Sequence, residues 1–356
     1  MLKVAIVGIQ GVPANYGGFE SLVENLIGEN CPDDIKYTVF CSSKDMDAKT
    51  ATYKGADLKY VNLHANGISS IPYDIISMCR VIRNYDVILV LGVSGCLFMP
   101  ILRLLTRARI IVNIDGLEHR REKWGKLART ILRQSEAMAV RFANQIVADN
   151  KGIQDYVKDT YGKDAALIAY GGDHVHRNVA PPQQDAILDK YGLTKNGYAV
   201  TVCRIEPENN SHRILEAFSQ SDYPLLFIGN WNHSDWSRSL REKYRGHKNI
   251  HLADAVYDLD ILYTLRSNAA LYIHGHSAGG TNPSLVEAMH FGIPIAAWDV
   301  VYNRETTHNK AYYFSSPQEL LQLLSRTDLS GTPMVDLART QYTWRVIADR
   351  YCQLYR

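Results

Sequence analysis

Short β-branched runs alternate with segments of helical period along the whole chain, and this alternation limits the fold more than any other feature of the sequence. The segment 19–27 has apolar residues at helical spacing, which predicts an amphipathic helix. Strands that alternate with helices form parallel sheets with crossover connections, so the sequence predicts an α/β fold. The predicted strands are 3–8, 37–41, 58–63, 87–91, 110–114, 145–148, 166–168, 197–203, 225–229, 249–252, 270–274, 294–298 and 311–314.

The chain has 356 residues, which is too long for one ordinary domain. A polar, proline-rich stretch at about 175–185 separates two series of strands. We predict a Rossmann-like domain over 1–177, a second one over 178–340, and a terminal helix over 341–356 that returns to the first domain. Ligands of open parallel sheets bind beyond the carboxyl ends of the strands. The chemistry is therefore expected in loops that follow strands, around a central cleft that the two domains face.

The composition excludes several classes of protein. Hydrophobic residues make up 46% of the chain and charged residues 21%, with a net charge of +2 and no charged tail, so nucleic acid is not an obvious partner. The six cysteines are scattered without metal-ligand spacing, which predicts reduced thiols, no metal site and no cofactor. The N-terminus does not resemble a signal peptide, and the apolar runs 87–93 and 96–102 are too short to span a bilayer. We expect a cytoplasmic protein.

A glycine-rich loop follows the first predicted strand and precedes a helix. Its members are Gly8, Gly11, Tyr16, Gly17 and Gly18. Glycines let a backbone approach a ligand, and amide groups at the start of a helix suit an anion. The spacing is not the GxGxxG of dinucleotide-binding proteins, and neither domain supplies that motif. The loop is thus a predicted ligand loop; the alternative is a tight turn without a ligand.

A second loop follows the predicted strand 270–274 and leads into another helix. Asn282 is a favourable N-cap and Pro283 a favourable first helical residue, so free backbone N–H groups are expected at this point. Glu287 lies one turn further on, where its carboxylate could accept hydrogen bonds from the hydroxyls of a nucleotide ribose. The alternative is that Glu287 only neutralises the start of its helix. The predicted binding residues here are His276, Gly279, Gly280, Thr281, Asn282, Pro283 and Ser284.

This stretch resembles the donor-binding motif of family 4 retaining glycosyltransferases, which has two glutamates eight positions apart before EAM-x-x-G-x-P. The chain has Glu287 at the second position, followed by the matching residues up to Pro294, but Gly279 at the first. The segment 202–210 resembles the GR-x-x-P-E-K loop of the same family, with Arg204 at the diphosphate-binding position and Asn209 in place of the lysine. For Arg204 the alternative is a surface ion pair with an adjacent glutamate.

These departures from the common pattern resemble a narrower group, the bacterial polysaccharide rhamnosyltransferases that use dTDP-L-rhamnose. The resemblance implies a GT-B fold and a hexosyltransferase that moves L-rhamnose onto a saccharide acceptor, linked to a lipid diphosphate, in the synthesis of cell-surface polysaccharide. It implies that Arg204 and Glu287 act in catalysis without a metal ion. Backbone amides of Gly279 to Asn282 would replace the missing carboxylate.

Asp115 follows the predicted strand 110–114 and is the candidate base for the acceptor hydroxyl, or else a turn cap. The surrounding segment 100–133 holds nine basic residues against three acids, interleaved with Leu, Ile and Trp124. Such a segment suits the inner surface of the cell membrane, where the protein would be peripheral; the alternative is an ordinary solvated helix face.

Two other functions fit parts of the sequence. A nucleotide-sugar epimerase of the same two-domain layout would release a changed donor without any acceptor. A nucleotide-sugar-binding protein that has lost catalysis would account for Gly279 and Asn209. Arg204 and Glu287 at the family positions favour transfer over epimerisation, and detectable hydrolysis or transfer of the donor would exclude the binding protein.

Overall fold

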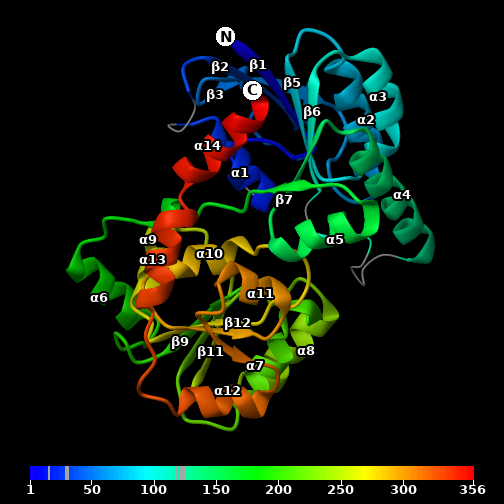
Figure 1. The fold of residues 1–356 in the computed structure, drawn as a ribbon. Helices are drawn as coiled ribbons and strands as arrows, with labels where there is room; N and C mark the ends of the chain where they lie inside the picture. The colour runs from blue at the N-terminus through cyan, green and yellow to red at the C-terminus, as the bar shows by residue number, and fades with distance from the viewer. Residues whose placement is uncertain (15–16, 29–31, 115, 118, 120–124) are drawn as a thin grey trace. The chain divides into compact units, whose positions relative to one another are not determined.

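The computed structural model describes residues 1–14, 17–28, 32–114, 116–117, 119 and 125–356. The chain forms two compact units, each with its own sheet (Figure 1). Unit 1 contains Met1–Tyr170 together with Trp344–Arg356, and unit 2 contains Gly171–Thr343. The first part of unit 1 thus ends at Tyr170, and the proline-rich segment at about 175–185 lies in unit 2. Pro181 in this segment is the first residue of a helix.

Unit 1 is built on a sheet with strand order β3-β4-β2-β1-β5-β6-β7-β8. All neighbouring strands are parallel except the short β3, which pairs antiparallel with β4. The strands are β1 (Leu2–Val7), β2 (Ile35–Ser42), β3 (Thr52–Tyr53), β4 (Ala56–Val61), β5 (Val87–Leu91), β6 (Arg109–Asn113), β7 (Gln145–Ala148) and β8 (Ala165–Leu167). The helical segments described are α1 (Gly18–Leu26), η1 (Gly67–Ser69), α2 (Ser70–Arg80), η2 (Cys96–Phe98), α3 (Met99–Leu105), α4 (Lys126–Phe142) and α5 (Lys151–Tyr161).

The terminal helix α14 (Trp344–Tyr355) belongs to unit 1, although the residues before it belong to unit 2. It packs against α1, as Figure 1 shows for the red helix beside the blue one. Its buried face includes Trp344, Ile347 and Tyr351, which join the core around the central strands. Burial of these large side chains holds the helix on unit 1, which confirms the predicted return of the C-terminal helix.

Unit 2 has a sheet of six parallel strands in the order β11-β10-β9-β12-β13-β14. The strands are β9 (Ala199–Val202), β10 (Leu225–Ile228), β11 (Ile250–Ala253), β12 (Leu271–His274), β13 (Ile295–Trp298) and β14 (Tyr312–Phe314). The helical segments are η4 (Asp173–Val175), α6 (Pro181–Lys190), η5 (Pro207–Asn209), α7 (Ser211–Phe218), α8 (Asp235–Tyr244), α9 (Leu259–Ser267), α10 (Pro283–Met289), α11 (Val301–Thr306), α12 (Pro317–Leu324) and α13 (Thr332–Gln341).

The local sequence explains most of these elements. The central strand β5 is apolar and buried at every position, as expected for a parallel strand covered on both faces. Helix α8 starts at a capping box between Ser234 and Ser237, and α9 starts where the Asp258 carboxylate accepts from two backbone amides. Every predicted strand is present, with ends that differ by a residue or two. The α/β prediction with two Rossmann-like sheets is confirmed.

Candidate functional site

The sheet of unit 2 reverses its strand order between β9 and β12. Loops that leave two such strands turn to opposite faces of the sheet, and the space between them is where open α/β sheets bind ligands. The two loops here are 203–210, which carries Arg204, and 275–282, which carries the glycine-rich motif. The topology therefore brings together the two segments in which the sequence predicted donor-binding residues.

Hydrogen bonds join these two loops directly. Asn209 Nδ2 donates to the Arg204 carbonyl at 2.8 Å, and the side-chain oxygen of Asn209, Oδ1, accepts from His276 Nδ1 at 2.7 Å. Since that oxygen only accepts, the proton of the His276 ring lies on Nδ1. Asn210 Nδ2 donates to the Gly275 carbonyl at 2.9 Å. The two loops thus form one hydrogen-bonded unit across the sheet.

Further hydrogen bonds and close backbone contacts join the same two loops. Ser277 donates from both its backbone nitrogen and its hydroxyl to the Glu208 carbonyl, at 2.9 and 2.8 Å. The loops approach so closely that a Cβ at Gly275 would lie 2.2 Å from the Asn209 carbonyl oxygen. Only glycine fits at that position, because any side chain would push the loops apart.

Asn209 occupies the family position of a lysine but does not serve as a solvent-facing polar group. It is buried, and both ends of its amide are used to hold the two loops together. The sequence indicated a missing positive charge at this position. The structure shows in addition a positioning residue whose amide geometry a lysine could not reproduce.

Arg204 is the exposed cation of this site, with 46% of its side chain accessible. Its guanidinium lies 3.5 Å from Glu206 Oε1 and 3.7 Å from Glu208 Oε1, so the surface ion pairs considered from the sequence are present. Both contacts are long and exposed to solvent, and pairs of this kind contribute little to stability. The Arg204 guanidinium is therefore able to exchange these partners for a phosphate.

The loop after β12 ends as the sequence predicted. Asn282 caps α10 by accepting from the Ser284 amide at 3.0 Å, and Pro283 is the first helical residue. Gly279 has φ +91°, a conformation in which L side chains are strained. The backbone at the position of the missing glutamate thus has the geometry that glycine favours.

Glu287 is held by a buried arginine that sequence reasoning missed. Arg266 is 2% exposed, and its Nη1 lies 2.7 Å from Glu287 Oε2. Its Nη2 donates to the Ser284 carbonyl at 3.3 Å, and its guanidinium lies 4.9 Å from the Phe291 ring centroid. The other carboxylate oxygen, Oε1, lies 3.6 Å from His174 Nε2. Nothing in the sequence distinguished Arg266 from the other basic residues near helix ends.

His274, at the end of β12, is buried beside this site. Burial, together with the neighbouring His276, lowers the pKa of His274 well below its ordinary value. The ring is consequently neutral at pH 7 and adds no positive charge. Thr281 is also buried, with its hydroxyl 3.5 Å from that of Thr306.

In unit 1, the glycine-rich loop after β1 is held by acidic side chains of α1. Glu20 Oε1 accepts from the Gln10 amide at 2.9 Å, and Glu24 Oε2 accepts from the Ala14 amide at 2.6 Å. Gly17 is the N-cap residue of α1 and Gly18 its first residue. Tyr16 lies outside the described residues. The two carboxylates accept hydrogen bonds from backbone amides that could otherwise donate to an anion.

A second polar cluster of unit 1 centres on Glu136, which is buried in α4. One of its oxygens accepts from the Tyr156 and Tyr161 hydroxyls at 2.8 and 2.7 Å, and the other lies 3.1 Å from His119 Nδ1. His119 follows β6 closely in the sequence, near the predicted base Asp115. Asp115 lies outside the described residues, as do Arg120, Arg121, Lys123 and Trp124 of the basic segment. The contact between His119 and Glu136 could not be predicted from the sequence.

Comparison with known families divides the chain near the boundary of the two units. Residues 183–325 match the family model "Glycosyl transferases group 1", and residues 1–173 match a model described as a domain of unknown function, DUF1972. We call residues 183–325 the transferase domain because of this match. It contains Arg204, the joined loops, Arg266 and Glu287, so the match agrees with the glycosyltransferase resemblance in this part of the chain.

Solved structures with the same fold cover nearly the whole chain. Sucrose-phosphate synthase from Thermosynechococcus elongatus has a TM-score of 0.82 at 14% identity, covering 100% of this chain and 98% of its own. Anabaena HepE in complex with UDP-glucose has a TM-score of 0.74 at 14% identity and covers 99% of both chains. S. aureus MnaA, solved with UDP, has a TM-score of 0.64 at 15% identity, with coverage of 99% and 95%. The GT-B fold is thereby confirmed, and none of the curated proteins compared with the chain matches it.

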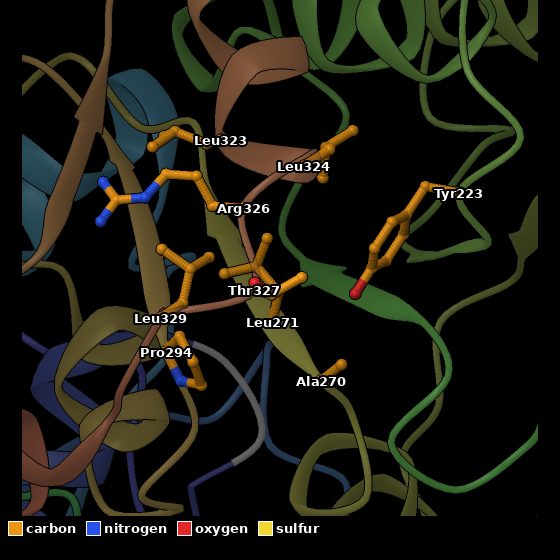
Figure 2. A pocket seen from close by; sticks show the side chains of 9 residues that line it. All are labelled: Tyr223, Ala270, Leu271, Pro294, Leu323, Leu324, Arg326, Thr327 and Leu329. Atoms are coloured by element: carbon orange, nitrogen blue, oxygen red, sulfur yellow. The ribbon is translucent and has the colours of Figure 1, made fainter.

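A hollow of about 170 Å³ in the transferase domain lies away from the joined loops (Figure 2). Ala270, Leu271 and Pro294 contribute to it from the starts of β12 and β13, with Leu323 near the end of α12 and Arg326 just after that helix. Parallel sheets bind their ligands at the opposite, carboxyl edge. The hollow is therefore not part of the candidate donor site.

Two further findings concern metals and membranes. Among the described residues, no three His, Cys, Asp or Glu side chains are grouped so that they could hold a metal ion. None of the described helices combines the length and the apolar character needed to cross a bilayer.

Proposed function

We propose that the chain is a retaining glycosyltransferase that moves L-rhamnose from dTDP-L-rhamnose onto a saccharide acceptor. The acceptor is linked to a lipid diphosphate, and the reaction belongs to the synthesis of cell-surface polysaccharide. The enzyme acts on the cytoplasmic side of the membrane. The transferase domain binds the donor, and unit 1 binds the acceptor.

One observation carries this proposal: an exposed Arg204 on a loop that is fixed to the glycine-rich loop at the switch point of the transferase domain. The departing nucleotide diphosphate gains negative charge as the glycosidic bond to it breaks. A preorganised cation stabilises that charge without reorganisation during the reaction. The planar guanidinium of Arg204 suits two phosphate oxygens at once.

The solved neighbours support a nucleotide-sugar donor. HepE was solved with UDP and with UDP-glucose, and MnaA was solved with UDP. Both have the GT-B fold of this chain. The donor of this chain is accordingly a sugar linked to a nucleoside diphosphate.

Glu287 supports recognition of the nucleoside sugar. Arg266 Nη1 lies 2.7 Å from its Oε2, and His174 Nε2 lies 3.6 Å from its Oε1. Each carboxylate oxygen can accept more than one hydrogen bond, so Glu287 can still accept from a hydroxyl of the nucleoside. The choice of dTDP over UDP rests on the resemblance of the sequence to the rhamnosyltransferases.

For the acceptor hydroxyl, Asp115 remains the proposed base, and backbone amides of Gly279 to Asn282 contact the donor sugar. The described His119, whose Nδ1 is held by buried Glu136, is a second group that could hold this proton. In a front-side retaining reaction the donor phosphate itself can take the proton. A His119→Ala variant separates these routes. Loss of transfer with intact donor binding would identify His119 as the base, whereas retained transfer would leave Asp115 or the donor phosphate.

The deciding experiment is calorimetric titration of the chain with dTDP-L-rhamnose, UDP-glucose and UDP-N-acetylglucosamine. We expect preference for the dTDP sugar and a loss of about 10- to 100-fold in affinity for Arg204→Ala, because one charge-assisted phosphate contact is removed. Arg238→Ala is the matched control, since Arg238 is an exposed arginine of the same domain paired with Asp235. Preference for a UDP sugar would overturn the donor, and equal binding by Arg204→Ala would overturn the phosphate site.

An epimerase of the same layout is the alternative enzyme. A solved putative UDP-N-acetylglucosamine 2-epimerase from Listeria monocytogenes shares the fold, at a lower TM-score than the sucrose-phosphate synthase and HepE structures. Product analysis distinguishes the two reactions: an epimerase converts the nucleotide sugar without an acceptor, while a transferase releases dTDP only when an acceptor or water takes the sugar. Donor binding with neither reaction would indicate a non-catalytic binding protein.

A further inference from the structure

Two departures from the family pattern, Asn209 and Gly279, lie at opposite ends of the buried His276 ring. Asn209 Oδ1 lies 2.7 Å from His276 Nδ1. At the other end of the ring, a Cβ at Gly279 would lie 3.7 Å from Nε2. In the part of the chain that the structure describes, and leaving aside the chain neighbours of Gly279, no other heavy atom lies within 4 Å of that Cβ position. His276 thus connects the two positions at which the chain differs from the family.

The orientation of the His276 ring is fixed by buried amides. Asn209 is 3% exposed, and its Nδ2 donates to the Arg204 carbonyl, so the side chain presents its oxygen to the ring. The backbone of His276 is held as well, because its carbonyl accepts from Asn303 Nδ2 at 2.9 Å, and Asn303 is 2% exposed. Turning the ring would leave buried polar groups without their hydrogen bonds, which is costly. Nε2 therefore keeps its direction toward Gly279.

The chemistry of His276 Nε2 suits a sugar hydroxyl. When the ring is neutral, its proton lies on Nδ1 and Nε2 is an acceptor; when the ring is charged, Nε2 is a donor. A hydroxyl both donates and accepts, so it can bind Nε2 in either form. In the family pattern, a glutamate at position 279 would extend from the same Cβ position toward the donor sugar. His276 Nε2 thus lies beside the place where that side chain would begin.

Asn209 makes this arrangement possible, and the lysine of the family pattern would prevent it. A lysine ammonium has three donors and no acceptor, so it could not accept from an Nδ1–H group. A donor at that place favours the opposite tautomer of His276, in which the proton lies on Nε2. The two departures, Asn209 for lysine and Gly279 for glutamate, are therefore linked through one ring, although they are distant in the sequence.

We propose that His276 is a specificity-determining residue for the donor sugar, with Nε2 hydrogen-bonded to a sugar hydroxyl in place of the absent glutamate. Asn209 is the positioning residue that sets the ring. This inference deepens the proposed function and rests on it for the presence of a sugar linked to a nucleoside diphosphate. It adds a side chain to the backbone amides that are proposed to contact the same sugar.

The test is calorimetric titration of the full chain and its variants with dTDP-L-rhamnose and with dTDP alone. His276→Asn keeps a polar group near the place of Nδ1 and loses the one at Nε2, whereas the longer amide of His276→Gln can reach the place of Nε2. We expect His276→Asn to lose about 3- to 10-fold in affinity for dTDP-L-rhamnose and none for dTDP, because one hydrogen bond to the sugar is removed. His276→Gln should recover part of that loss.

His247→Asn is the matched control. His247 precedes β11 and so lies at the amino edge of the same sheet, away from the donor loops. This variant should bind both ligands like the unaltered chain.

Nitrogen NMR of the chain labelled with 15N-histidine tests the role of Asn209 separately. The His276 signals are identified by their absence from His276→Asn, and in the unaltered chain they should show the proton on Nδ1. Asn209→Ala should lose this preference and weaken dTDP-L-rhamnose more than dTDP. A residue that only joins the two loops would affect both ligands equally.

Two results would overturn the proposal. One is an equal loss of affinity for dTDP and dTDP-L-rhamnose in His276→Asn, which would mean that the ring only supports the loops. The other is a neutral His276 ring with its proton on Nε2 in the unaltered chain. If the unaltered chain prefers a UDP sugar, the same comparison is made with that sugar and UDP, so that a wrong donor is distinguished from a wrong role for His276.

Discussion

The loop after β1 in unit 1 and the loops after β9 and β12 in unit 2 occupy equivalent places, because each follows a strand where the order of its sheet reverses. Their supports differ. Carboxylates of Glu20 and Glu24 bind the loop of unit 1, while neutral amide, hydroxyl and imidazole groups join the loops of unit 2. A ligand near the first loop meets negative charge, and a ligand near the second meets Arg204.

This contrast in charge suggests how two sheets of one architecture can bind two different substrates. A diphosphate is disfavoured beside two carboxylates and favoured beside an exposed guanidinium. Sugar hydroxyls, in contrast, can donate to carboxylates. The comparison therefore agrees with a donor site in the transferase domain and an acceptor site in unit 1, and it can be challenged by substitutions on either side.

The largest effect is expected at the buried ion pair of unit 2. Glu287→Gln removes the counter-charge of Arg266, which is 2% exposed, and should lower the free energy of unfolding by about 3 kcal/mol. Chemical denaturation measures this loss. Arg266→Met combined with Glu287→Gln should recover much of it, because no unpaired buried charge remains.

The matched control for that pair is Asp299→Asn, which breaks the exposed pair with Arg304 in the same unit. It should change stability far less, since both partners remain in water. An equal effect of the two substitutions, or no recovery in the double variant, would show that Glu287 is not fixed by its buried partner. Arg266 would then not be the group that orients Glu287 toward the nucleoside.

A smaller, pH-dependent effect is expected in unit 1. Burial acts to raise the pKa of Glu24, but hydrogen bonds from the Ala14 amide, Tyr53 and Lys54 outweigh it and lower the pKa below 4.5. A depressed carboxyl pKa stabilises the fold above the unfolded value of 4.5, and this stabilisation is lost as pH falls through the folded pKa. Glu24→Gln should therefore cost roughly 1–2 kcal/mol at pH 7 and much less in acid.

Thermal unfolding of the unaltered chain and of Glu24→Gln, measured from pH 7 to pH 3, checks the Glu24 prediction. Asp57→Asn is the control, because its pair with Lys36 is exposed and no comparable set of hydrogen bonds holds it. If the cost of Glu24→Gln were the same at pH 7 and pH 3, charge would not be what holds the loop after β1, and the contrast between the two units would lose its electrostatic basis.

The smallest effect is expected at Gly279. Alanine at φ +91° should cost about 1 kcal/mol through backbone strain, with no steric clash, since the nearest atom to a Cβ there is His276 Nε2 at 3.7 Å. Gly246→Ala is the control, because Gly246 has open space and no positive φ. Equal stability of the two variants would mean that position 279 tolerates a side chain. Gly279→Glu would then test the family glutamate there directly.

Local sequence signals predicted much of the transferase domain. Asn282 and Pro283 mark the start of α10 through capping and a fixed φ, which depend on neighbouring residues only. The resemblance placed Arg204 and Glu287 on the loop and helix where they are found. Trp344, Ile347 and Tyr351 revealed the apolar face of the terminal helix through their spacing.

Other features could not be predicted in this way. Asn209 looked like a lost lysine until its amide was seen to join two loops, and Arg266 looked like one more basic residue near the end of a helix. His119 and Glu136 are separated in the sequence by residues that give no sign of their contact. Each of these pairings forms between segments that are distant along the chain.

Periodicity, capping and motif spacing are local properties, so the α/β class, the succession of strands and the position of Arg204 on its loop could be predicted from the amino-acid sequence. The contact between Arg266 and Glu287 and the need for glycine at 275 emerge from the three-dimensional structure alone. Those properties depend on the distance between side chains brought together by strand order, and neither composition nor spacing encodes that distance.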